Sequence, residues 1–71
     1  MPEDPLSGDL MRGVPKMVPF FQALFDDRRI DEKDIRNWIS RDRFPYGRDG
    51  GVIIGSKSLI REHYRRLAGL K

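Results

Sequence analysis

One stretch of this 71-residue chain limits what it can fold into: a short amphipathic segment that runs from Asp31 to Arg43. Its large apolar side chains are Ile35, Trp38 and Ile39, and this i, i+3, i+4 spacing is typical of one face of an α-helix. Asp31 is a favourable N-cap, because its carboxylate can accept hydrogen bonds from the free amides of the first turn. The segment therefore predicts a helix with one narrow apolar face and a polar face opposite.

The residues after this helix predict a β-hairpin. Pro45 disfavours helical backbone at Phe44, so the helix must end soon after Arg43. Asp49-Gly50-Gly51 then precedes the β-branched run Val52-Ile53-Ile54. A tight hairpin turn needs positive φ, which glycine adopts at little cost. Val52 and Ile54 are expected on one face of the second strand and Ile53 on the other, and the small hairpin must pack against helices to be stable.

A helix is expected on each side of this unit. The first covers Val18–Phe25, with Pro19 in its opening turn. Its apolar face holds Val18, Phe21, Leu24 and Phe25. The last covers Lys57–Ala68, with Ser56 or Ser58 as its N-cap and Gly69 as its C-terminal cap. Its inward residues recur at helical spacing and are Leu59, Ile60, His63, Tyr64 and Leu67.

Length and composition indicate one small domain, residues 17–71, after a flexible N-terminal tail, residues 1–16, that holds three prolines and two glycines. The chain has no cysteine and one histidine, which excludes disulfides and a thiolate zinc site. No apolar run approaches the roughly 20 residues of a membrane helix, and the N-terminus lacks the basic start of a signal peptide. We expect a cytoplasmic protein that is not an enzyme and needs no metal or cofactor.

Charge is distributed unevenly along the chain. Residues 1–27 carry two basic and five acidic side chains, a net charge of −3. Residues 28–71 carry twelve basic and six acidic side chains, a net charge of +6. A positive charge concentrated in one unit favours a polyanionic partner, although a solvated basic surface gives the same count.

The predicted order of elements is that of a small winged helix-turn-helix, in which the second helix reads the DNA major groove. Such a helix needs apolar anchors on one face and side chains that reach bases and phosphates on the other. Arg36 and Arg41 can bind guanine through two hydrogen bonds, and Asn37 can bind adenine in the same way. Lys33 and Ser40 suit phosphates. The candidate contacts from the wing and its flank are Arg43, Tyr46 and Arg48.

Residues 35–45, the glycine-rich turn and residues 54–59 together resemble the excisionase-type winged helix of the MerR-like superfamily, which includes DNA-binding domains of phage terminase small subunits. Trp38 matches the core tryptophan of that group, Pro45 its helix-stopping proline and Leu59 the anchor of its last helix. Asp42 stands where the group usually has glycine, and an aspartate tolerates left-handed backbone.

The resemblance implies a mainly α fold with a small β-hairpin (α+β), that is, three helices plus a two-stranded wing. It also implies a phage or mobile-element accessory factor that binds and bends double-stranded DNA near a recombination site. Its implied partners are an integrase or recombinase and further copies of the chain on DNA.

Other interpretations of the sequence remain open. A regulator or a packaging subunit of the same fold would use the same groove chemistry. A protein-interaction module, such as an antirepressor or scaffold, would instead use a surface of Phe20, Phe21 and Phe25 with the acidic tail. Residues 50–58 only approach a phosphate-binding loop, because the lysine is displaced by one position. His63 is expected to pack rather than to bind metal, and Asp26-Asp27 to be neutralised by neighbouring arginines.

Overall fold

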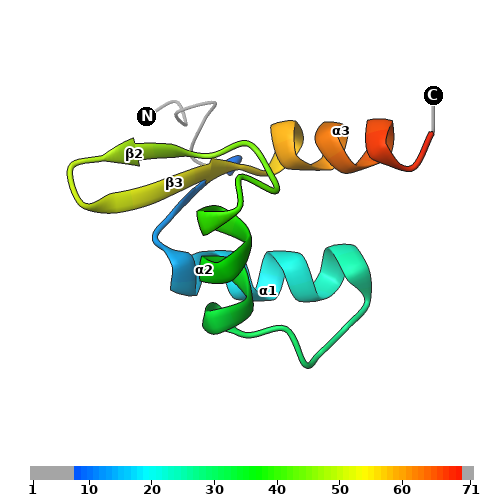
Figure 1. Cartoon of the computed structure of the whole chain (residues 1–71), viewed down its shortest axis with the longest axis horizontal. Coiled ribbons are helices and arrows are strands. Elements are labelled where there is room, and N and C mark those ends of the chain that lie inside the picture. The colour runs from blue at the N-terminus through cyan, green and yellow to red at the C-terminus, as the bar shows by residue number, and fades with distance from the viewer. Residues whose placement is uncertain (1–7, 70–71) are drawn as a thin grey trace.

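A computed structural model describes residues 8–69, and over this range the chain forms three helices and a three-stranded antiparallel sheet (Figure 1). The elements follow one another as β1 (Leu10–Arg12), α1 (Val14–Phe25), α2 (Glu32–Ser40), β2 (Gly47–Asp49), β3 (Val52–Ser56) and α3 (Lys57–Leu67). The predicted α+β class is confirmed, with one strand more than expected. None of the described helices has the length and apolar character needed to cross a membrane.

Helix α2 forms where the amphipathic segment predicts it. Asp31 caps the helix: its carboxylate accepts from the Asp34 amide at 3.0 Å, and the Asp34 carboxylate accepts from the Asp31 amide at 3.2 Å. This reciprocal pair is a capping box, of which the N-cap alone contributes about 1 kcal/mol. Ile35 and Ile39 are buried. The helix ends at Ser40, and the chain reverses through Asp42, whose φ of 52° lies in the left-handed region.

The predicted hairpin is confirmed as strands β2 and β3, joined by a turn in which Gly50 has a φ of 65°. Strand β3 is the centre of the sheet, because β1 pairs with its other edge. Arg48 lies opposite Ile53, and Met11 lies opposite Gly55. Ile53 packs against the core, so Val52 and Ile54 lie on the outer face of the sheet.

The expectation of a flexible tail is wrong for residues 10–16, and residues 1–7 lie outside the described range. Leu10–Arg12 form β1, and the buried side chain of Met11 explains why this strand is held in place. Gly13, at a φ of 95°, turns the chain from the strand directly into α1. The first helix therefore begins four residues before Val18, and Pro19 lies inside it rather than in its opening turn.

The core lies between the inner face of the sheet and the two helices α1 and α2. Its fully buried large side chains are Met17, Phe21, Ile35 and Ile60. Gly55 allows the sheet backbone to approach this core closely. A Cβ atom at this position would lie 3.1 Å from the Met17 Cε and 3.2 Å from the Ile60 Cδ1.

Two predicted apolar faces are only partly correct. On α1 the buried residues are Val14, Met17 and Phe21, whereas Phe25 is 40% exposed. On α3 only Ile60 is buried, while Leu59 and Leu67 are 61% and 68% exposed. The predicted anchor role of Leu59 is therefore wrong. Because α3 starts directly after β3 and continues away from the sheet, only part of its surface meets the core (Figure 1).

Candidate nucleic-acid interface

The outer face of α2 and its C-cap residue Arg41 together present all five polar residues that the sequence predicts as a reading surface. Ile35 and Ile39 point into the core, and this fixes which side of the helix faces water. The five side chains lie on the opposite side, and each of their residues is exposed: Lys33, Arg36, Asn37, Ser40 and Arg41. Anchoring by two buried isoleucines therefore brings these residues onto one accessible surface.

Charge along this face increases toward the C-terminal end of α2. Residues 31–41 carry three acids and three bases, and all the acids lie in the first turn or at its cap. Glu32 pairs with Arg36 at 3.1 Å. Beyond the helix, Arg43 is also exposed. Positive potential on this face is thus expected around Arg41 and Arg43 rather than at the N-terminal turn.

Ser40 is partly engaged within its own helix. Its hydroxyl donates to the Asn37 carbonyl at 2.8 Å. The oxygen lone pairs remain exposed, but the hydroxyl proton must leave the carbonyl before it can be offered to a phosphate. Ser40 is accordingly a weaker candidate phosphate donor than Lys33.

Arg48 lies on the side of the sheet that faces α2. It pairs with Ile53, whose side chain packs against the core, so both side chains leave the sheet on the same face. Arg48 is exposed, and its guanidinium carbon lies 5.8 Å from the centroid of the Tyr46 ring. The hairpin that carries it extends away from the helices (Figure 1). Arg48 thus shares its side of the molecule with the end of α2.

Tyr46 joins the base of the hairpin to the end of α2. Its hydroxyl donates to the Asp42 carboxylate at 3.0 Å and lies 3.4 Å from the Ile39 carbonyl oxygen. The ring is half-buried and packs beside Phe44 at a centroid distance of 6.0 Å. Tyr46 therefore sets the angle between helix and hairpin, and its hydroxyl is already occupied in the protein.

His63 plays a similar connecting role from α3. Its Nε2 lies 2.8 Å from the Arg43 carbonyl oxygen, and because a carbonyl only accepts, this nitrogen carries the proton. The bond holds the connection between α2 and β2 against α3. The prediction that His63 packs within the protein agrees with this contact.

Two polar contacts were not predicted, because both depend on β1. Arg12 forms an ion pair with Asp49 at 3.0 Å, on the sheet face opposite Arg48. The Asp9 carboxylate binds the start of α3: it accepts from the Ser56 hydroxyl, the Ser58 amide at 2.8 Å and the Ser58 hydroxyl at 3.1 Å. These hydrogen bonds, the one from Ser56 foremost, lower the pKa of Asp9 below its ordinary value.

The structure also bears on the other interpretations of the sequence. Phe21 is fully buried and Phe20 is half-buried, so the phenylalanines of α1 do not form one exposed surface. Residues 50–58 form the hairpin turn, β3 and the start of α3 instead of a phosphate-binding loop. Asp27 accepts from the amide and guanidinium of Arg29, at 2.9 and 3.2 Å, as expected for neutralised loop charges.

No protein-family model, curated protein or solved structure matches this chain. Its function must therefore be argued from the geometry of its own residues.

Proposed function

We propose that this protein is a winged helix-turn-helix that binds double-stranded DNA sequence-specifically, as an excisionase-like accessory factor. One observation carries the proposal. Four polar residues of α2 and the Arg41 that caps its C-terminus are exposed on the face opposite its buried isoleucines, and the exposed Arg48 lies on the same side of the molecule, on a projecting hairpin. A helix held from behind, with an arginine-bearing loop beside it, is the arrangement that reads a major groove and contacts the flanking backbone.

The charge distribution supports contact through the C-terminal half of α2. Phosphates repel the acids of the first turn, whereas Arg41, Arg43 and Arg48 carry no counterion among the ion pairs of residues 8–69. Arg36 and Asn37 then face the bases, and the three free arginines face the strands on either side. In this pose Tyr46 acts indirectly, by fixing the hairpin relative to α2.

The wider role follows from the same chemistry. An accessory factor of recombination binds and bends DNA beside a recombinase, so we propose an integrase and further copies of this chain as partners. A transcriptional regulator or a packaging subunit is the alternative role for the same surface. These roles differ in the site they bind, and not in the groove contacts.

Selection of a bound site from a pool of randomised duplexes tests the proposal directly. Arg36→Ala and Asn37→Ala are expected to weaken binding to the enriched site about tenfold, because one base contact is worth about 1–3 kcal/mol. Both variants should leave binding to random duplex nearly unchanged. Arg48→Ala is expected to weaken both by a similar factor. If about five phosphates are neutralised, log affinity falls with log salt at a slope of roughly −4 to −5.

Arg66→Ala is the matched control for Arg36→Ala. Arg66 lies on α3 and forms the same kind of i, i+4 pair, with Glu62 at 2.9 Å, but it is not part of the α2 face. Its removal changes net charge equally and should affect affinity by less than about twofold. Affinity that does not depend on salt, or an equal loss on every duplex for all four variants, would contradict the proposal.

A further inference from the structure

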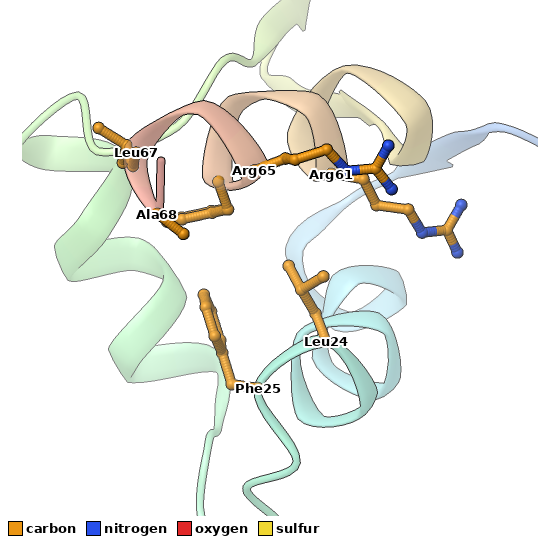
Figure 2. A pocket seen from close by; sticks show the side chains of 7 residues that line it. Leu24, Phe25, Arg61, Arg65, Leu67 and Ala68 are labelled. Carbon is orange, nitrogen blue, oxygen red and sulfur yellow. The ribbon is translucent and has the colours of Figure 1, made fainter. Parts of the chain in front are cut away.

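A groove of about 520 Å³ lies between the end of α1 and the C-terminal half of α3 (Figure 2). Leu24 and Phe25 line it from α1, and Tyr64 and Leu67 line it from α3. The Phe25 and Tyr64 rings meet edge to face, with centroids 5.0 Å apart. Burial raises the pKa of the Tyr64 hydroxyl above its ordinary value, which shows how apolar its surroundings are.

The groove exposes to water apolar side chains that are not part of the buried core. Phe25 and Leu67 are two of the four large hydrophobic side chains exposed in the described part of the chain, and both lie here. Phe25 lies on α1 and Leu67 lies on α3, so a single segment bound in the groove between the two helices can cover both side chains. Contiguous exposed apolar surface of this kind marks an interaction site more often than scattered single residues do.

Two arginines, Arg61 and Arg65, border the groove on α3. They are one helical turn apart, so their side chains leave the same face. The Arg61 guanidinium carbon lies 5.2 Å from the centroid of the Phe20 ring, a contact that holds it beside the groove. No acidic residue lines the groove, and neither arginine forms an ion pair within residues 8–69.

We propose that this groove binds an acidic amphipathic segment of a partner protein. Apolar side chains of that segment contact Phe25 and Leu67, and its carboxylates pair with Arg61 and Arg65. Charge complementarity selects an acidic partner, because the apolar floor is bordered by two cations and by no anion. The open side at Leu67 favours a protein segment over a small molecule, which would keep much of its surface in water.

This proposal does not depend on DNA binding. The hairpin that carries Arg48 and the C-terminal end of α3 lie at opposite ends of the molecule (Figure 1). Failure of either proposal therefore leaves the other intact.

The test uses the full chain and two labelled 16-residue peptides. Both peptides carry leucines at helical spacing on one face; one has glutamates beside the leucines and the other has lysines there. The glutamate peptide is expected to bind at least about tenfold more tightly than the lysine peptide, because two exposed charge contacts are gained in one and reversed in the other. Backbone amide shifts in an NMR titration should concentrate at Phe25, Tyr64 and Leu67.

Matched variants on α3 separate the groove from the rest of the helix. Leu67→Asp should weaken binding of the glutamate peptide about tenfold, whereas Leu59→Asp, at an equally exposed leucine outside the groove, should not. Arg65→Glu should weaken binding, and the neighbouring Arg66→Glu should have less than about a twofold effect.

Five outcomes would overturn the proposal. The first four are equal binding of the two peptides, binding that is unaffected by Leu67→Asp, amide shifts confined to α2 and the hairpin, and self-association of the chain that Leu67→Asp abolishes. The fourth would assign the groove to a second copy. The fifth is competition by a peptide of residues 1–7 alone, which would assign the groove to the leading segment of the same chain.

Discussion

A single aspartate connects the beginning of the described chain to its last helix. The Asp9 carboxylate accepts from Ser56 and Ser58 at the start of α3, and the Asp9 carbonyl accepts from the Lys57 amide at 2.8 Å. The carboxylate satisfies one free amide of the first turn, that of Ser58, and lies at the positive end of the helix dipole. At the scale of one residue, Asp9 thus fixes the position of β1 relative to the N-terminus of α3.

Substitution of this aspartate is expected to alter acid stability. The folded-state pKa of Asp9 is lowered from its ordinary value of 3.8, first by the Ser56 hydroxyl and then by the Ser58 amide. A group with a depressed folded pKa contributes stability above its unfolded pKa and loses it as pH falls through the folded pKa. Asp9→Asn should therefore be less stable than the wild type near neutral pH, and the difference should shrink below pH 3.8.

Urea unfolding at a series of pH values measures this difference. The Ser58→Ala background supplies the control, because Ser58 donates to Asp9 and the two substitutions should be less than additive. A stability difference between wild type and Asp9→Asn that stays constant from neutral to acid pH would contradict the assignment.

At the scale of elements, α2 and α3 carry equivalent ion pairs, but only the pair on α2 is expected to affect the affinity for duplex DNA. Glu32 pairs with Arg36 on α2, and Glu62 pairs with Arg66 on α3, both at i, i+4 spacing. Glu32→Gln should tighten duplex binding about two- to fourfold, because it frees Arg36 and removes an anion from the proposed interface. Glu62→Gln removes the same charge from α3.

Fluorescence anisotropy with one duplex at about 100 mM salt, where screening acts over about 10 Å, compares the two variants. Glu62→Gln should change affinity by less than about 1.5-fold at that salt. Equal tightening by both variants would mean that only net charge matters, and it would remove α2 from the interface.

Elements with a local signal could be predicted from the sequence, and elements that depend on distant partners could not. Helix α2 has its cap, apolar spacing and proline stop within fifteen residues, 31–45, and the hairpin has its glycine turn. Strand β1 is three residues long, and its partner β3 lies more than forty residues further along the chain. Nothing local indicates such a strand, so the sequence predicts a tail where residues 10–16 form β1 and the start of α1.

In the candidate site, too, features with a local signal can be predicted and features that depend on distant partners cannot. The outward face of α2 follows from the inward face, because a helix anchored by Ile35 and Ile39 can expose only the opposite residues. The engaged hydroxyl of Tyr46 and the ion pair between Arg12 and Asp49 require the tertiary fold. The groove at Phe25 and Leu67 arises because α3 extends past the core, whereas helical spacing alone predicts both residues as buried.

At the scale of the whole molecule, the two proposed surfaces lie on different parts of a small fold. The longest dimension is 37 Å, with the hairpin at one end and the C-terminal end of α3 at the other (Figure 1). At physiological salt, charges more than about 8 Å apart in water are largely screened. Bound DNA at Arg48 should therefore have little effect on an acidic segment at Leu67.

Duplex and peptide are consequently expected to bind the protein together. The affinity for the glutamate peptide in saturating duplex should stay within about threefold of its value without DNA, because the screened repulsion between the two anions is weak. Arg43 can couple the two sites, because it is exposed beside α2 and its charge also acts on the Tyr64 hydroxyl in the groove. Arg43→Ala should reduce whatever coupling is measured, and Arg41→Ala serves as its control. Mutual exclusion of duplex and peptide would mean that the peptide binds the α2 face, since a groove bordered by Arg61 and Arg65 on α3 leaves that face free.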